Sequence, residues 1–172
     1  MNNYGELINP TTLKFVRLLP GPIERVWEYL TDDHKRALWF AGGSTDLTPG
    51  GDMKLVFSNS QLSSPPDPTP EKYKDYGDGY VSQAKILRCE APRLLKISWE
   101  GVVTFELEEI ENKVKLTLIH EKLQDDNETR VGTLAGWHTH LDILFDKLND
   151  KAPEGFWSVH MPLEDEYRLR IT

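Results

Sequence analysis

The sequence predicts an α+β domain in which a curved antiparallel sheet wraps one long helix. Three observations favour this fold class. Apolar and polar residues alternate in several short runs separated by turn residues, as in strands with one buried face. A later stretch has the 3.6-residue apolar spacing of a long amphipathic helix. The order of the elements is a strand, two helices, a series of strands and then the long helix, which is typical of α+β domains.

The first elements are a strand and two short helices. Residues 12–19 are predicted as a strand because most of their apolar side chains occur at every second position and would therefore share one face of the strand. The strand ends at the sequence PGP. A helix is predicted over residues 22–30, where Pro22 suits the first helical turn. A second helix is predicted from Asp32 to about Trp39.

The middle of the chain favours an antiparallel meander. Apolar and polar residues alternate clearly over residues 53–57 and more weakly over residues 79–89, which predicts two strands. Between them, residues 58–78 contain four prolines and are predicted as a long loop, which is either a functional lid or simply mobile. Two-residue turns suitable for hairpins separate three further strands, predicted at residues 93–99, 102–110 and 113–120.

The long helix is predicted over residues 128–148. His138 and His140 in the sequence GWHTHLDILF would share a face on a strand, but side chains two apart on a helix diverge by about 200°. A metal site built on this pair is therefore not expected. The apolar stripe of the helix is formed by Leu134, Trp137, Leu141, Leu144, Phe145 and Leu148.

A second helical segment is predicted over residues 153–171, interrupted at Pro162. It is expected to pack against the domain, with a partner-binding role as the alternative. We therefore predict a domain over residues 1–150 and a helical extension over residues 151–172. His34 and His160 have polar neighbours and are expected to lie in solvent.

Composition excludes several classes of function. The net charge of −8, without a basic stripe, disfavours nucleic-acid binding. No apolar stretch approaches the roughly 20 residues of a membrane span, and no secretion signal is recognisable, so a cytoplasmic location is expected. Cys89 is the only cysteine, which excludes an intrachain disulfide and favours a packing role in or just after a strand. No phosphate-binding glycine loop or metal-ligand cluster is present, so no cofactor or metal is expected.

Four segments in order carry a family resemblance: PIERVWEYLTDDHKRALWFAGGSTDLTPGGDMKLVF, CEAPRLLKISWEG, VKLTLIHEKL and AGWHTHLDILFDKL. Over residues 12–150 the chain resembles the SRPBCC superfamily, and within it the activator of Hsp90 ATPase homologue 1-like proteins, which share the helix-grip fold of START and Bet v 1 proteins. The terminal FWSVHMPLEDEYRLRI resembles an extension seen in a bacterial subset of that branch. The proline-rich loop is longer than the usual connection in the family.

The resemblance implies a cavity between sheet and helix that holds an apolar or amphipathic small molecule in many members. Large rings and His120 share the inward side of the predicted strands, as a ligand pocket requires. The same rings would also fill a solid core, and periodicity does not separate the two. His120 and His138 have the further alternative of core histidines bonded to backbone carbonyls. The candidate ligand-binding residues are Trp39, Phe57, Trp99, Phe105, His120, Trp137 and Leu141.

Two other functions remain open. A cyclase- or hydratase-type enzyme would use a cavity histidine with a carboxylate such as Glu106 or Glu121, although alternation predicts that Glu106 faces away from the cavity. The family name also suggests a chaperone partner. Ile143 is expected on the outer side of the long helix, where it would be available to a homodimer surface.

Overall fold

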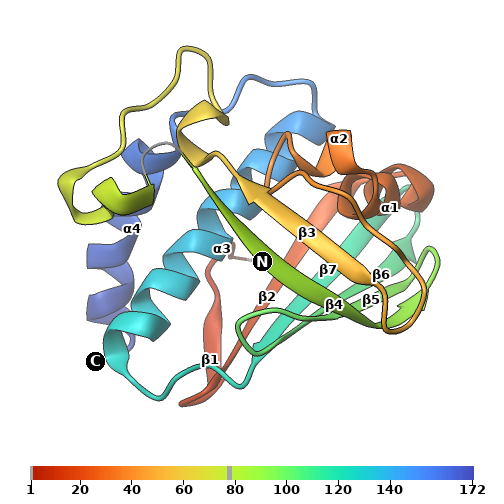
Figure 1. Ribbon diagram of the computed structural model, residues 1–172, viewed down its shortest axis with the longest axis horizontal. Coiled ribbons are helices and arrows are strands. Elements are labelled where there is room, and N and C mark those ends of the chain that lie inside the picture. The colour runs from red at the N-terminus through yellow and green to blue at the C-terminus, as the bar shows by residue number, and fades with distance from the viewer. Residues whose placement is uncertain (1, 77–78) are drawn as a thin grey trace.

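Seven antiparallel strands form one curved sheet that wraps a long helix (Figure 1). The computed structural model describes residues 2–76 and 79–172, and it confirms the predicted α+β class. The spatial order of the strands is β1-β2-β7-β6-β5-β4-β3. The strands are β1 (Glu6–Asn9), β2 (Thr12–Pro20), β3 (Asp52–Phe57), β4 (Tyr80–Glu90), β5 (Leu94–Ser98), β6 (Val102–Ile110) and β7 (Lys113–Glu121).

The helices lie at one end of the sheet and across its inner side. Helices α1 (Ile23–Thr31) and α2 (Asp33–Arg36) follow β2, whereas α3 (Asn127–Leu148) and α4 (Phe156–Arg170) end the chain and pack side by side (Figure 1). The loop between β3 and β4 contains two short 3-10 helices, η1 (Asn59–Gln61) and η2 (Glu71–Tyr76). In the described ranges, none of these helices is both long and apolar enough to cross a bilayer.

The predicted alternation of the central strands is confirmed by their register. Phe15 of β2 lies opposite Leu118 of β7, which in turn lies opposite Phe105 of β6. Two residues before Phe15 in β2, Leu13 lies opposite His120 of β7. All five side chains are buried. Since cross-strand neighbours share a face, this register places one continuous apolar surface towards α3.

Helix α3 begins where predicted and is covered on two sides. The Asp126 carboxylate accepts a 2.8 Å hydrogen bond from the Thr129 amide, which caps the first turn. One side of the helix faces the sheet and another is covered by α4. The expected exposure of Ile143 is therefore wrong, because it is 3% exposed. The predicted burial of Phe145 is also wrong, because it is 40% exposed.

Three other elements differ from expectation. The second helix is only four residues long, because the chain turns after Arg36, whose buried guanidinium donates to the Ala41 and Gly43 carbonyls. Strand β1 was not expected, since it is short, lies at the sheet edge and has little apolar alternation. The loop expected over 58–78 contains η1 and η2, and its last two residues, 77 and 78, lie outside the described part of the chain.

Candidate functional site

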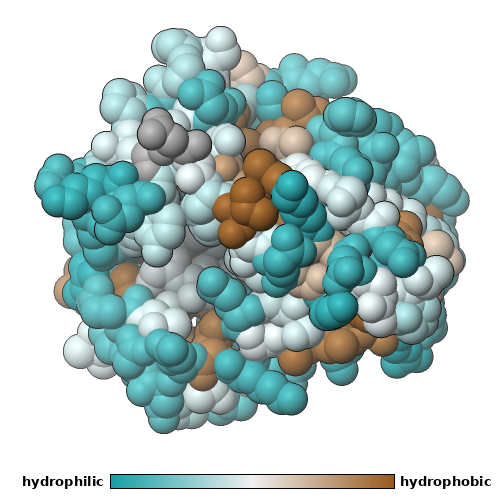
Figure 2. Space-filling view, in the orientation of Figure 1, coloured by the Kyte–Doolittle hydropathy of each residue, from teal (hydrophilic) through white to brown (hydrophobic). Residues whose placement is uncertain are grey.

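A cavity of about 650 Å³ lies between α3, α4, the β3–β4 loop and β4. The space-filling view shows this face hollowed between the side that carries α4 and the side that carries β4 (Figure 2). Its walls contain stacked aromatic rings. Phe40 stacks on Trp137 with ring centroids 5.0 Å apart, and Phe57 stacks between Trp99 and Tyr80 at 5.6 and 4.7 Å. Aromatic rings thus form much of the wall beside polar side chains, and the cavity is open to solvent.

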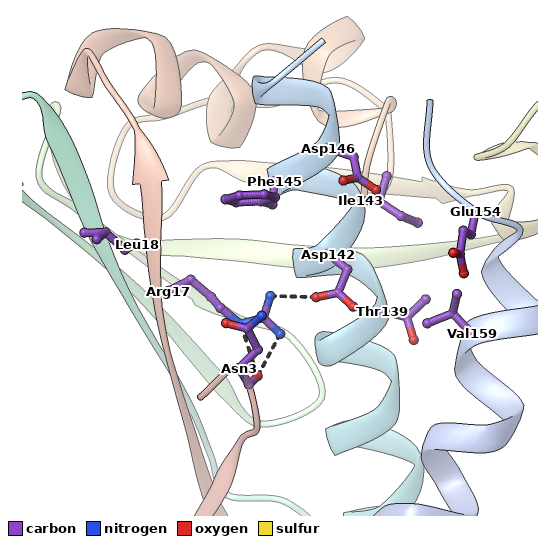
Figure 3. Close-up of a pocket in the computed structure, with 10 residues that line it drawn as sticks. All are labelled: Asn3, Arg17, Leu18, Thr139, Asp142, Ile143, Phe145, Asp146, Glu154 and Val159. Carbon is purple, nitrogen blue, oxygen red and sulfur yellow. Dashed lines mark hydrogen bonds and ion pairs between the residues drawn. The ribbon is translucent and has the colours of Figure 1, made fainter. Parts of the chain in front are cut away.

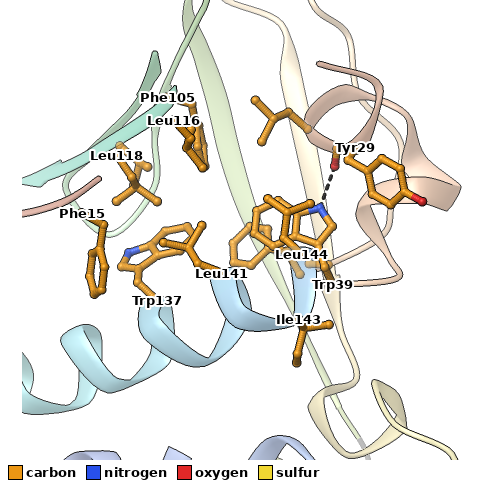
Figure 4. Packing of buried hydrophobic residues seen from close by; sticks show 14 of the residues in the cluster. Phe15, Tyr29, Trp39, Phe105, Leu116, Leu118, Trp137, Leu141, Ile143 and Leu144 are labelled. Carbon is orange, nitrogen blue, oxygen red and sulfur yellow. Dashed lines mark hydrogen bonds between the residues drawn. The ribbon is translucent and has the colours of Figure 1, made fainter. Parts of the chain in front are cut away.

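The seven candidate residues separate into two groups. Four of them line the cavity, namely Phe57, Trp99, His120 and Trp137. The other three, Trp39, Phe105 and Leu141, are buried in the hydrophobic core beside the cavity (Figure 4). The two alternatives left open by periodicity thus coexist, since the inward side of the sheet contributes to both a solid core and a hollow.

The core group is held by packing and by one buried hydrogen bond. The Trp39 indole N–H donates to the Tyr29 carbonyl at 2.7 Å, at the end of the core near α1 (Figure 4). Phe105 meets Trp137 edge to face with centroids 5.8 Å apart. Leu141 is fully buried beside them. These three side chains pack behind the residues that line the cavity and do not line it themselves.

His120 is bonded on both ring nitrogens. Its Nδ1 lies 3.0 Å from the Trp137 indole nitrogen, which has only a proton to donate, so Nδ1 is the acceptor. The proton is then on Nε2, which donates to the Glu100 carbonyl at 2.8 Å. Burial lowers the pKa of His120 and keeps the ring neutral. His120 therefore has the structural role of a core histidine bonded to a carbonyl, at the cavity wall.

His140 also lines the cavity, although no pattern in the sequence distinguished it from His138 as a site residue. Its Nδ1 donates to the Trp39 carbonyl at 2.8 Å. Burial lowers the pKa of His140 to about 4, so the ring is neutral and Nε2 has an unshared electron pair. Since His138 is directed to Tyr167 instead, the two histidines do not converge on one point.

The expectation that His160 lies in solvent is wrong. The residue is 4% exposed, because α4 packs against α3 and the β3–β4 loop. Its Nε2 lies 2.7 Å from the Glu164 carboxylate one turn later, and Glu164 also accepts hydrogen bonds from Tyr73 and Lys72. Burial alone would raise the pKa of Glu164, but the bonds from His160, Lys72 and Tyr73 outweigh it and lower the pKa to about 2. A buried carboxylate thus orients the imidazole of His160.

Two glycines of α3 open the cavity on its helix side. Gly132 and Gly136 line it, and a Cβ added at Gly136 would meet no described atom within 4 Å. Sequence reasoning missed both. The available signal was the presence of two glycines four residues apart inside a long helix, where glycine costs about 1 kcal/mol relative to alanine. A helix face without side chains leaves room for another molecule.

Four further wall residues come from the β3–β4 loop and the C-terminal helix, in which no ligand-binding residue was predicted. Tyr73 and Tyr76 of η2, with Phe156 and Trp157 of α4, close the cavity opposite the sheet. Tyr73 stacks on Trp157 with centroids 4.9 Å apart. These four residues are far along the sequence from the cavity residues of the sheet, so no local sequence pattern connects the two groups.

A second cavity, of about 420 Å³, lies on the other side of α3 (Figure 3). Its centre is the buried Arg17, which donates to Asp142 at 2.8 Å and to the Asn3 carbonyl. His138 extends the network, since its Nδ1 lies 2.7 Å from the Tyr167 hydroxyl and its Nε2 lies 3.6 Å from Asp142. Burial and the charge of Arg17 lower the pKa of His138 to about 4. Arg17, Asp142 and His138 are thus paired with one another or with other protein groups, which is typical of a structural network.

The carboxylates considered for catalysis lie away from the cavity histidines. Glu106 is exposed on the outer face of β6, as alternation predicts, and Glu121 is half-buried at the end of β7. Neither lines the aromatic cavity. Among the described residues, no group of three His, Cys, Asp or Glu side chains is arranged to hold a metal ion.

Comparison with known proteins places the chain in a family. The family model described as "Activator of Hsp90 ATPase homolog 1-like protein" matches residues 20–149. No curated protein matches the sequence. The fold is similar to that of a Bordetella parapertussis protein solved by NMR, with a TM-score of 0.82, 38% identity and coverage of 99% of this chain and 91% of that one.

Two more distant structures share the fold. CalU16 from Micromonospora echinospora has a TM-score of 0.65 and 23% identity, with coverage of 92% of this chain and 86% of that one. DynU16, a protein of the dynemicin biosynthetic locus, has a TM-score of 0.62 and 19% identity, with coverage of 83% and 49%. With the family model matching most of the chain, this protein belongs to the activator of Hsp90 ATPase homologue 1-like family of the SRPBCC superfamily, with the helix-grip fold.

Proposed function

We propose that the protein binds a small apolar or aromatic molecule in the cavity beside α3. One observation carries the proposal: stacked aromatic walls and the bare helix face at Gly132 and Gly136 meet in one open cavity of about 650 Å³. Small-molecule sites commonly have volumes of about 300–1,000 Å³, apolar walls and a few polar groups. Phe57, Trp99 and Trp137 are the proposed ring contacts.

The charge of the cavity favours a neutral aromatic molecule over a fatty acid. Among the described lining residues there is no Lys or Arg to pair with a carboxylate, whereas Glu100 and Glu128 are present. Flat rings can stack on Phe57 and Trp99 in the offset geometry that aromatic pairs prefer. The fold likeness to a protein of the dynemicin biosynthetic locus also supports a polyketide-like aromatic.

A reaction that uses His120 as acid or base has less support. Both of its ring nitrogens are engaged by Trp137 and Glu100, so proton transfer to a ligand would first have to break a buried hydrogen bond. A chaperone partner is suggested by the family name alone. We therefore place binding before catalysis and before chaperone interaction.

The proposal is tested by amide NMR titration of the protein with palmitate, quercetin and 1,8-dihydroxyanthraquinone. We expect saturable shifts with the two aromatic compounds, clustered at Trp99, Gly132, Gly136 and Trp157. Uniform silence, or shifts scattered over the outer face of the sheet, would contradict it. In the second case, stimulation of a purified Hsp90-type ATPase by the protein would favour the chaperone alternative.

A further inference from the structure

We infer that the α4 end of the cavity is a recognition site for a hydroxyl group, so that the ligand is a phenol or hydroxylated aromatic. The inference rests on the proposed function and specifies its ligand. It depends on two residues, His160 of α4 and Asn59 of η1, which line the same cavity from segments far apart in the sequence.

The first observation is a pair of buried polar atoms without partners. In the described part of the chain, two buried side-chain polar atoms have no hydrogen-bond partner, His160 Nδ1 and Asn59 Oδ1. Buried polar atoms are rarely left unpaired, because each such atom loses its bonds to water. Both belong to residues of the cavity wall, which points to a bonding partner supplied by the cavity's occupant.

The second observation fixes the chemistry of the histidine. The Glu164 carboxylate, 3% exposed and bonded by Tyr73 and Lys72, can only accept, so His160 Nε2 is the donor towards it. In the neutral ring the proton is thus held on Nε2, and Nδ1 has an electron pair to accept with. The ring position is fixed further by stacking on Phe156, with centroids 5.4 Å apart.

With His160 in its neutral form, these groups match a proton donor in the ligand. His140 presents a third acceptor, since its Nδ1 proton is used by the Trp39 carbonyl. A ligand that carries only ethers or carbonyls would place acceptor against acceptor at these positions. A phenolic hydroxyl can donate to His160 Nδ1 while its ring contacts Phe156 and Trp157, which lie 4.9 Å apart between centroids.

The test compares two probes of similar shape, 2-naphthol and 2-methoxynaphthalene, by NMR titration at pH 7.5. We expect 2-naphthol to bind at least about tenfold more tightly, because losing the donor leaves a buried acceptor unpaired. Equal affinities in the wild type would overturn the inference and leave the proposed function intact. Failure of both probes, with silence across the wider panel as well, would overturn both.

Variants and a direct readout identify the acceptor. His160→Phe keeps a ring against Phe156 but removes Nδ1, so the preference for 2-naphthol should fall below about twofold while 2-methoxynaphthalene still binds. His34→Phe, at an exposed histidine, is the matched control and should keep the preference. Asn59→Leu should reduce the preference for 2-naphthol in part.

A measurement on the wild type, the ¹⁵N chemical shift of His160 Nδ1, tests the assignment without any substitution. The resonance should move upfield when 2-naphthol binds and not when 2-methoxynaphthalene binds. An unchanged resonance under saturating 2-naphthol would contradict the assignment even if the His160→Phe variant failed to fold.

Discussion

The Trp137 indole N–H donates a 3.0 Å hydrogen bond to His120 Nδ1, which joins the middle of α3 to β7 at the wall of the cavity. Both residues are almost completely buried. The bond determines the tautomer of His120 and thereby its second bond, to the Glu100 carbonyl. The geometry of the wall therefore depends on one polar contact inside an aromatic cluster.

Replacement of Trp137 by Phe should lower the free energy of unfolding by about 1–3 kcal/mol, because His120 Nδ1 is left buried and unpaired. Chemical denaturation followed by circular dichroism measures the loss. Trp99→Phe is the control, since the half-buried Trp99 donates to the Ser82 hydroxyl, which water can satisfy after the change. Equal losses in the two variants would show that the His120 bond is of no special importance.

Gly136→Ala should raise the free energy of unfolding by about 0.5–1 kcal/mol, because alanine loses less backbone entropy in a helix and its Cβ meets no described atom within 4 Å. Thermal and denaturant unfolding give the change. Gly101→Ala is the opposite case, since Gly101 has φ of +109° and a Cβ would lie 2.1 Å from the Glu121 carbonyl. A loss of about 1–3 kcal/mol or more is expected there. A destabilised Gly136→Ala would mean that the helix face is not open.

Arg17→Met should lower the free energy of unfolding by about 3 kcal/mol. Removing one member of a buried ion pair usually costs about 3–5 kcal/mol, and the lower value is expected here because the Asp142 side chain is 38% exposed. The double variant Arg17→Met/Asp142→Leu should recover part of this loss, since no buried charge remains unpaired. A double-mutant cycle in denaturant gives the coupling. Losses that simply add would contradict a direct role for the pair.

Acidification from pH 7 to 5 should weaken the fold. The pKa of His140 is about 4 in the folded chain, below the ordinary value of 6.5, so in this window the unfolded chain binds protons that the folded chain does not. The stabilisation is thus complete above about pH 6.5 and is lost as the pH falls towards 4. His140 contributes a slope of up to about 1.4 kcal/mol per pH unit, and His138 acts in the same direction.

Denaturant unfolding at pH 7, 6 and 5 measures this slope. His140→Phe should make it shallower, whereas His34→Phe, at an exposed histidine, should leave it unchanged. The role of His140 would be contradicted if the two variants had the same pH dependence as the wild type.

The sheet and the long helix could be predicted because one-sided burial produces a local period. The strand from Lys113 to Glu121 and the helix from Asn127 to Leu148 each have apolar residues at the spacing of the element. Burial on a second side has no such signal. Ile143 looks exposed in sequence because the period of α3 was assigned to the sheet alone, while α4 covers its other side. His160 looks exposed because its sequence neighbours are polar, although α4 packs against α3.

The site was predicted where it coincides with the apolar faces of the sheet and of α3, from which Trp137 lines the cavity. Phe57, Trp99 and His120 share the inward alternation and line the cavity. Trp39 has the same chemical character, yet it is core, because hydrophobicity does not distinguish filled from unfilled space. Gly136 defines the hollow by the absence of a side chain, which a search for large apolar residues overlooks.

The most direct test of the binding account is an amide NMR titration of 2-naphthol into the wild type and into Gly136→Leu. The added side chain should occupy the cavity without disturbing the fold, since a Cβ at this position has free space. The account predicts saturable shifts around Trp99, His140 and Trp157 in the wild type, and their loss in a variant that remains as stable as the wild type. Identical binding by the two proteins, or none by the wild type, would contradict a ligand site in this cavity.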